Sequence, residues 1–246
     1  MAWRSREVGI IKSCVLGAAL AAGLATAAQA GDNKLTLSAT TAFVTDYLFR
    51  GVTNTNDNPA AQPEIDLYYG IFYAGIWGSN TAFGDNIELD YYVGITPKWK
   101  SITFNIAALE YTYPGANDLD YFELKTAATW TGGNWTIGVT NYWSPDWGAV
   151  AGDSDAIEGQ VGYAFSGKIF NFFSPTISGG VAYQAFHEVF QDYTYWNVGL
   201  TLGFMEHWSV DARYWDTDLN DFDCTALSGV AHGCDGRVVG TLKAVF

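Results

Sequence analysis

Apolar and polar residues alternate with a period of two through most of the chain, and this pattern limits the possible folds more than any other feature. It is clearest in the last segment, "GRVVGTLKAVF". There Val238, Leu242 and Phe246 share one parity, whereas Arg237 and Lys243 share the other. Such alternation predicts a β-strand with one apolar and one polar face. A strand that stays ordered up to an aromatic final residue is expected to have a partner on both sides.

About twelve such segments follow one another, separated by breaks rich in Gly, Pro, Asn and Asp. The predicted strands span residues 35–49, 62–69, 71–79, 87–97, 102–113, 119–131, 135–144, 156–166, 175–186, 193–204, 208–216 and 236–246. Long breaks, such as "GVTNTNDNPAA", alternate with short ones, such as "KWKS", "GGN" and "MEH". On the short side only "SGKIFNFFSP" is longer than this alternation predicts.

Charged residues fall on one parity of these strands and large apolar residues on the other. In one strand, for example, Leu89, Tyr91 and Val93 alternate with Glu88 and Asp90. A charge that faces lipid at mid-depth costs roughly 2–4 kcal/mol, so the charged parity is expected to face a lumen. The predicted lumen-lining residues are Asp46, Glu64, Asp66, Glu88, Asp90, Glu123, Lys125, Glu158, Asp211, Arg213, Arg237 and Lys243.

Aromatic residues near the segment ends are assigned to the apolar parity, where membrane barrels carry their interfacial girdles. The expected girdle residues are Trp77, Tyr91, Trp130, Trp135, Trp196, Phe204 and Trp208. A soluble β-sandwich also alternates, but the long strands and the aromatic girdle favour a membrane barrel. Glu110 does not fit, because it shares the parity of Phe104 and Ile106. It lies either above the bilayer or beyond a β-bulge.

Long breaks at one end, short turns at the other and an even number of strands are the layout of an outer-membrane barrel. We therefore predict an all-β fold, a closed antiparallel transmembrane β-barrel of about 12 strands, as a single domain over residues 31–246. In lipid every backbone group needs an internal partner, so the last strand must pair with the first. The long breaks are expected outside the cell and the short turns in the periplasm.

Residues 1–30 are predicted to be a secretory signal peptide that is cleaved. Arg4, Arg6 and Lys12 precede a short apolar run, and "AQA" at residues 28–30 fits a small-x-small cleavage site. Cys14 lies at the start of the apolar run rather than at its end, which argues against a lipoprotein anchor. The predicted location is the outer membrane of a Gram-negative bacterium.

The exported part of the chain has two cysteines, Cys224 and Cys234. An even pair in an exported protein is expected to form a disulfide; two free thiols with metal affinity are the alternative. The formal net charge of −14 disfavours nucleic acid as a partner, because phosphate binding depends on clusters of Lys and Arg.

Several stretches resemble a known family. The segment "LSATTAFVTDYLFRGVTNTN", followed by "FYAGIWGSN" and "IELDYYVGI", resembles the opening of the TorF-like porins, a proteobacterial outer-membrane family. "TDYLFRG", from Thr45 to Gly51, is the most specific part, and the resemblance covers the whole exported chain. It implies a barrel with a channel function. It carries over no solute and no catalytic residue.

No catalytic residue, cofactor or metal site is predicted. Barrel hydrolases typically use Ser, His and an acidic or amide partner, whereas the histidines of the exported chain fall in breaks: His187, His207 and His232. "DTDLNDFD" begins like a calcium loop, but Asp221 replaces its turn glycine and Leu227 stands where a bidentate Glu is needed. An acidic, solvated loop is the simpler interpretation.

The predicted function is passive diffusion of small solutes through a narrow lumen whose acidic excess favours cations. Eight-stranded barrels are filled by side chains and sixteen-stranded ones hold a wide channel, so a twelve-stranded barrel leaves an alternative open. That alternative is a closed structural or surface-binding barrel with acidic extracellular loops. The expected partners are outer-membrane lipids, small solutes or ions, and the barrel assembly machinery, which is expected to read Phe246. The oligomeric state stays open.

Overall fold

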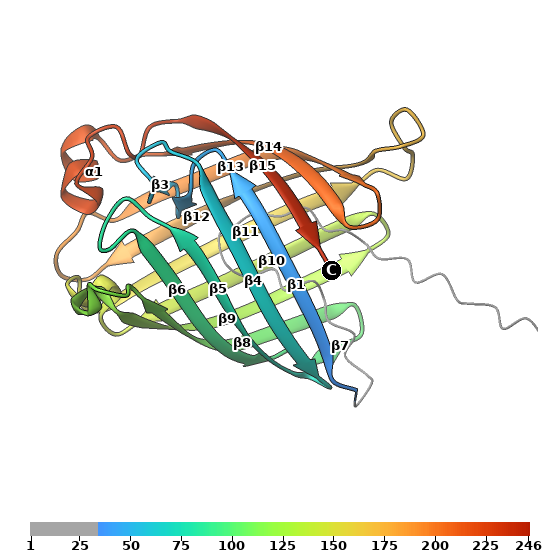
Figure 1. Cartoon of the computed structure of the whole chain (residues 1–246), viewed down its shortest axis with the longest axis horizontal. Helices are drawn as coiled ribbons and strands as arrows, with labels where there is room; N and C mark the ends of the chain where they lie inside the picture. The colour runs from blue at the N-terminus through green and yellow to red at the C-terminus, as the bar shows by residue number, and fades with distance from the viewer. Residues whose placement is uncertain (1–33) are drawn as a thin grey trace, which may run out of the picture.

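The computed structural model describes residues 34–246. The predicted signal peptide, with Cys14 and the cleavage motif at residues 28–30, lies outside the described residues. Within them the chain forms one antiparallel β-barrel (Figure 1). No helix among residues 34–246 is long and apolar enough to cross a membrane.

Twelve strands make up the wall of the barrel. They are β1 (Thr36–Val44), β4 (Ala60–Tyr69), β5 (Phe72–Asn80), β6 (Ile87–Ile95), β8 (Ile102–Thr112), β9 (Tyr121–Gly132), β10 (Trp135–Ser144), β11 (Ser154–Ala164), β12 (Ser174–Phe186), β13 (Tyr193–Phe204), β14 (Trp208–Thr217) and β15 (Arg237–Val245). Each pairs with its sequence neighbours, and β1 pairs with β15 to complete the ring. The predicted fold class and strand number are confirmed.

The seam between the first and last strands extends beyond the regular register. Strand β1 pairs with β15 from Thr40, opposite Val245, to Val44, opposite Thr241. Ala39 and Phe246 then exchange both backbone hydrogen bonds, at 3.0 and 2.8 Å. Closure leaves no unpaired strand edge, which an apolar bilayer requires.

The connections differ between the two ends of the barrel. One end, here called the loop end, holds the connections that contain η1 (Asn117–Leu119), η2 (Trp147–Ala149) and α1 (Asp221–Ser228). The other, the turn end, holds short connections such as residues 70–71 and 133–134 and the short strand β7 (Lys98–Trp99), which pairs with β8. Figure 1 shows α1 at one end of the barrel and the C-terminus at the other. The predicted alternation of long and short breaks is present, including the longer turn-end connection at residues 165–173.

The two faces of the wall differ as the alternation predicts. Ile65 and Leu67 on β4 are about half exposed, whereas Asp66 between them is buried. On β6, Tyr91 and Val93 are exposed and Asp90 is buried. A closed barrel with an apolar outer surface and a polar interior has the fold and the surface of an outer-membrane protein.

The assignment of Trp77 to the outer aromatic girdle is wrong. Trp77 pairs across the sheet with Glu64 and Asp90, and its ring lies 5.4 Å from that of Tyr47 in the barrel interior. The physical reason is the strand register, which sets the direction of a side chain whatever its chemistry. Ile76, next to it, takes the outward direction.

The structure also decides between the two explanations for Glu110. The ladder between β6 and β8 runs without interruption from Leu89, opposite Thr112, to Ile95, opposite Ile106. No β-bulge therefore changes the direction of the Glu110 side chain, and the bulge alternative is wrong. Its side chain is exposed on the outer face, two residues from the loop end of β8. Near the interface a charge costs far less than at mid-depth.

Candidate functional site

The connection from β1 to β4 folds into the barrel instead of extending the first strand. Strand β1 ends at Val44, not at residue 49 as predicted, and residues 48–53 form a hairpin of β2 (Leu48–Phe49) and β3 (Val52–Thr53). Its two turn residues, Arg50 and Gly51, have φ angles of +53° and +83°, as a type I′ turn requires. Leu48, Phe49, Arg50, Val52 and Thr53 are all buried. We call residues 48–53 the inner hairpin.

Arg50 at the tip of the inner hairpin reaches the far side of the lumen. Its Nη2 atom donates to both carboxylate oxygens of Glu123 on β9, at 2.8 Å each, and its Nη1 atom donates to Gln184 on β12 at 2.9 Å. The Tyr142 ring on β10 lies 5.0 Å from the guanidinium. In the ring of twelve strands, β10 lies directly opposite β1, with β9 next to it and β12 two strands away on the other side. The hairpin therefore spans the lumen.

The ion pair between Arg50 and Glu123 is almost completely removed from solvent, with 5% and 1% of the two residues exposed. Glu123 also accepts a hydrogen bond of 3.0 Å from the Tyr111 hydroxyl. A buried pair of this kind depends on complete hydrogen bonding, because desolvation of each charge is costly. The carbonyl oxygen of Arg50 accepts a further bond from the Tyr193 hydroxyl at 3.1 Å.

Asp46 forms the second anchor of the inner hairpin. Its carboxylate accepts hydrogen bonds from the hydroxyls of Thr53, at 2.6 Å, and Thr55, at 2.8 Å. It also accepts a bond of 3.0 Å from Arg237 on β15. The amide of Thr53 in turn donates to the carbonyl of Gly233 at 2.9 Å. The hairpin is therefore fixed to the last strand and to the last loop-end connection.

Two clusters of buried apolar residues flank the inner hairpin, and the second extends from the loop end to Tyr68 and Tyr73 beside the β4–β5 turn. One contains Leu48, Val52, Ala151, Ala182, Phe186, Tyr193, Tyr195, Trp215, Cys224, Cys234 and Val239. The other contains Tyr47, Phe49, Ala60, Tyr68, Tyr73, Ala107, Leu109, Tyr111, Tyr113 and Tyr121. Within the second, Tyr111 stacks on Tyr121 with ring centroids 4.4 Å apart. Side chains from the wall and from the hairpin thus pack together, and the second cluster continues into the turn half.

The half near the turn end is organised differently, around groups that stay on the wall. The Tyr92 hydroxyl on β6 bonds with Glu64, at 2.9 Å, and with Asp66, at 2.6 Å, both on β4. Strands β4 and β6 are separated by β5 alone. The Tyr73 hydroxyl on β5 donates to Asn105 on β8 at 2.8 Å. These bonds follow the wall and do not cross the lumen.

A second wall group lies on β12, β13 and β14. Arg213 forms an ion pair with Asp211 on its own strand, with Nη2 and Oδ2 3.1 Å apart. It also donates to the side-chain Oδ1 atom of Asn197 at 2.6 Å and to the Ser178 hydroxyl at 2.9 Å. Thr201 donates to Asp211 at 2.6 Å. The positive charge is neutralised within one patch of wall.

The structure places the remaining predicted lumen residues as follows. Glu158 on β11 is buried and accepts a hydrogen bond from the Tyr195 hydroxyl. Lys125 on β9 is buried, and Lys243 on β15 is half-buried. Glu88 and Asp90 on β6 are buried, and the Tyr47 hydroxyl donates to Glu88 at 3.2 Å. The predicted residues thus lie on the inner side of the wall or around the hairpin.

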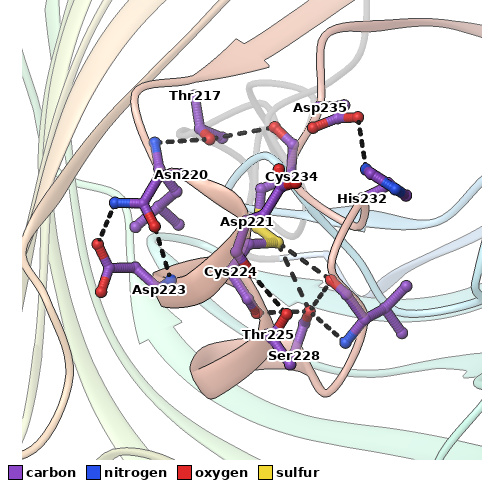
Figure 2. The surroundings of a disulfide bond; sticks show 12 residues. Thr217, Asn220, Asp221, Asp223, Cys224, Thr225, Ser228, His232, Cys234 and Asp235 are labelled. Atoms are coloured by element: carbon purple, nitrogen blue, oxygen red, sulfur yellow. Dashed lines mark hydrogen bonds and ion pairs between the residues drawn. A yellow bond between two sulfur atoms is a disulfide. The ribbon is translucent and has the colours of Figure 1, made fainter.

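The disulfide between Cys224 and Cys234 is present, with Cα atoms 5.9 Å apart, and this prediction is confirmed (Figure 2). It ties α1 to the segment before β15. The stretch "DTDLNDFD", which begins like a calcium loop, contains the N-cap of α1. Asn220 accepts hydrogen bonds there from the amides of Phe222 and Asp223. Thr217 donates to the carbonyl of Cys234 at 3.1 Å, which fixes the base of the loop.

One exposed group beside the disulfide has metal-ligating chemistry. Ligand atoms of Asp221, His232 and Asp235 lie within 4.8 Å of one another, and Figure 2 shows His232 facing Asp235. All three side chains are exposed, and exposed acidic groups commonly lie together without an ion. His187 and His207 also lie in connections, outside the strands of the wall.

Sequence reasoning missed the hairpin residues that matter most in the lumen, above all Arg50. A signal for them exists in the sequence. On a strand that continued to residue 49, Tyr47 and Phe49 would face outward while Leu48 and Arg50 faced inward. In the sequence, an Arg and a glycine come directly after three large apolar residues. Such a pair fits a turn better than the continuation of a strand. The wall partner Gln184 carries no such signal.

Comparisons with known proteins agree with this fold. The sequence model of the family described as "Bacterial protein of unknown function (Gcw_chp)" matches residues 28–246. No curated protein matches the sequence. Among solved structures, "KdgM porin" superposes with a TM-score of 0.58 at 8% identity, covering 85% of this chain and 99% of that one.

Two further porin structures cover the chain to a similar extent at lower similarity. "NanC porin structure in rhombohedral crystal form" has a TM-score of 0.48 at 10% identity and covers 85% of this chain and 98% of that one. "Salmonella typhi OmpF complex with Daunomycin" has a TM-score of 0.46 at 10% identity and covers 87% and 98%. At these identities the likeness concerns the fold.

Proposed function

The chain belongs to the Gcw_chp family of bacterial proteins of unknown function, and we propose that it is a porin-like channel of the outer membrane. It passes small solutes by passive diffusion and prefers cations. The polar interior of a closed twelve-stranded barrel supports this proposal, as does the fold it shares with the KdgM porin. The partners that follow are outer-membrane lipids, the permeating solutes or ions, and the barrel assembly machinery.

The excess of acidic side chains in the interior carries the proposed cation preference. Among residues 34–246, the buried acidic residues are Asp46, Asp66, Glu88, Asp90, Glu123, Glu158 and Asp211. The buried basic residues of the same part are Arg50, Lys125 and Arg213. In a narrow lumen with walls of low dielectric constant, such an excess raises the occupancy of cations and repels anions.

The inner hairpin sets the narrowest part of the proposed path. Its tip is held by Glu123 and Gln184 on the opposite wall, so it occupies the lumen of the loop half. The charged groups of the turn half, by contrast, remain on the wall. We therefore propose a path that the inner hairpin constricts on the loop side, with a small conductance.

A closed barrel with a structural or surface-binding role is the second candidate. The observation in its favour is the packing of Leu48 and Phe49 against two apolar clusters, which fills much of the loop half. Asp218, Asp221 and Asp223 in the last loop-end connection would then provide the acidic outer surface. Conduction separates the two candidates, because a closed barrel carries no current.

Ion selectivity in planar bilayers tests the proposal. Purified protein is inserted under a KCl gradient, and the reversal potential is expected to have the sign of cation preference and to weaken as salt screens the charges. The variant Glu64→Gln/Asp66→Asn is expected to lower the preference, since it removes two acidic side chains from the lumen. A matched control is Asp218→Asn, which removes a loop charge. Reversal potentials that indicate anion preference would refute the mechanism.

We also propose that the loop end faces the cell exterior and the turn end the periplasm. Short turns on the periplasmic side are typical of bacterial outer-membrane barrels. The opening segment, with its "TDYLFRG" motif, supports a relationship to the TorF-like porins, which stays a prediction. A cysteine at Lys98 is expected to stay unlabelled by an impermeant reagent in intact cells, whereas one at Asn56 is expected to react.

A further inference from the structure

Glu88 and Asp90 form an acidic pair that is buried in the lumen. They lie two residues apart on β6, so both point into the lumen from the same face of the strand. Each is 1% exposed. Both carboxylate oxygens of Asp90 lack a hydrogen-bond partner among residues 34–246, whereas the side chains of Tyr47, Tyr113 and Asn54 lie within hydrogen-bonding reach of Glu88. An ionised carboxylate in such a position is costly unless something neutralises it.

The nearby cation is already engaged elsewhere. Arg50 directs its Nη1 and Nη2 atoms to Gln184 and Glu123, so its guanidinium does not bond with Asp90. Asp90 lies opposite Trp77 on β5 and Tyr111 on β8. Tyr111 gives its hydroxyl proton to Glu123 at 3.0 Å. Neither Arg50 nor Tyr111 therefore donates a hydrogen bond to Asp90.

The pair is closed to solvent, and hydroxyl-bearing side chains lie beside Glu88. The Tyr47 hydroxyl, from the chain that leads into the inner hairpin, lies 3.2 Å from the Oε1 atom of Glu88. Ser79 is opposite Glu88 on β5, and its side chain is buried. The β1–β4 connection is bonded to the β5–β6 connection, since the amide of Ala82 donates to the carbonyl of Asn54 at 2.7 Å. Carboxylate, hydroxyl and carbonyl oxygens are the ligands that hard cations prefer.

We propose that Glu88 and Asp90 bind a hard divalent cation of the calcium type inside the lumen, beneath the β1–β4 connection. Two carboxylates supply two negative charges, and both oxygens of Asp90 are free to coordinate. A bare ion needs less room in this enclosed place than an organic cation. The site is distinct from the exposed group of Asp221, His232 and Asp235. It does not require the barrel to conduct, so its failure would leave the proposed channel untouched.

Calcium binding to the purified full-length barrel tests the proposal. The protein is stripped with a chelator in detergent, and binding of Ca²⁺ is measured by equilibrium dialysis. All proteins carry Asp221→Asn and Asp235→Asn, so that the exposed group does not contribute. Adding Glu88→Gln and Asp90→Asn is expected to remove one equivalent of bound calcium. The matched control, Asp66→Asn, changes a buried lumen carboxylate that already bonds with Tyr92, and it is expected to keep that equivalent.

A second measurement covers the case in which a variant folds poorly. Calcium is expected to raise the unfolding temperature of the parent barrel, because a ligand that binds only the folded state stabilises it. The same addition is expected to leave the unfolding temperature of the Glu88→Gln/Asp90→Asn barrel unchanged. Equal calcium binding with and without Glu88 and Asp90, or a parent barrel that neither binds calcium nor gains stability from it, would overturn the proposal. The pair would then be neutralised by protons alone.

Discussion

The loop half and the turn half of the lumen are built from similar side chains that are connected in different ways. In the loop half, Arg50 bonds with Glu123 and Gln184, which are 73 and 134 residues away in the sequence. In the turn half, Arg213 bonds with Asp211 and Asn197, which are 2 and 16 residues away. One arginine crosses the lumen, and the other stays on its patch of wall.

This difference predicts that the two halves respond differently when a substitution removes a bonding partner. The groups of the turn half are attached to strands of a closed ladder, so a lost partner leaves a buried charge that cannot move away. The inner hairpin is a connection whose backbone belongs to no strand of the wall. It can leave the lumen and become hydrated when its anchors are removed. The loop half is therefore the adjustable part of the barrel and the turn half the fixed part.

The largest effect is expected at Phe246, on the fixed side. Its backbone bonds with Ala39 at the seam, its ring stacks on His207, and it is largely exposed on the outer face. Phe246→Asp is expected to remove most of the assembled protein from the outer membrane, because an apolar surface residue and the predicted assembly signal are lost together. Immunoblots of outer-membrane fractions measure this.

The control for Phe246 comes from the loop end. Phe222 on α1 is 81% exposed but lies outside the barrel wall. Phe222→Asp is expected to assemble at the normal level. Equal levels of the Phe246→Asp and Phe222→Asp proteins would contradict the role assigned to the seam.

The two lumen arginines provide the next largest effect. Removing one partner of a buried ion pair costs about 3–5 kcal/mol. Arg213→Ala is expected to lower the free energy of unfolding by an amount of this order, because Asp211 cannot leave the wall. Arg50→Ala is expected to lower it less, since the inner hairpin can move out. Urea unfolding in detergent gives both values.

Thiol labelling gives the complementary measurement on the same two variants. A cysteine introduced at Val52, which is buried in the inner hairpin, reports on whether the hairpin leaves the lumen. It is expected to react with a maleimide much faster in the Arg50→Ala barrel and at an unchanged rate in the Arg213→Ala barrel. Equal acceleration in both would remove the distinction between an adjustable and a fixed half.

A smaller effect is expected from two glycines with positive φ, one at each end. A Cβ atom on Gly51 would lie 2.7 Å from Cγ2 of Thr217 and 3.1 Å from Cβ of Tyr195. One on Gly133, in a turn-end hairpin, would meet nothing within 4 Å. Left-handed backbone costs an L-residue roughly 1–2 kcal/mol at both positions. Gly51→Ala is expected to lower the thermal stability more than Gly133→Ala does, because only the Cβ atom at residue 51 meets other atoms. It is also expected to speed labelling of the cysteine at residue 52. Equal losses of thermal stability in the two variants would count against tight packing of the hairpin.

The barrel wall could be predicted from the sequence because its determinants are local. Period-2 alternation located every strand of the wall, and the cost of a charge in lipid separated the faces, as with Asp66 between Ile65 and Leu67. Trp77 was assigned to the wrong face because the assignment used its residue type and not its register in the strand. For a side chain in a ladder, parity is the stronger guide.

The inner hairpin could not be predicted in the same way, because its partners are distant in the sequence. Nothing near Arg50 indicates Glu123 or Gln184, which become its neighbours only when the ring closes. The free carboxylate oxygens of Asp90 are also a property of the folded lumen. Alternation assigns a residue to a face, but it does not show what occupies the space in front of that face.

The most direct test of the account is the single-channel conductance of two barrels in planar bilayers. One is the unchanged protein, and in the other residues 46–58 are replaced by a short Asn-Gly turn between β1 and β4. We expect the unchanged barrel to show a small conductance and the shortened one a conductance several times larger, because the constriction is removed while the wall is kept. An unchanged barrel that carries no current, or two barrels of equal conductance, would contradict a channel narrowed by its inner hairpin.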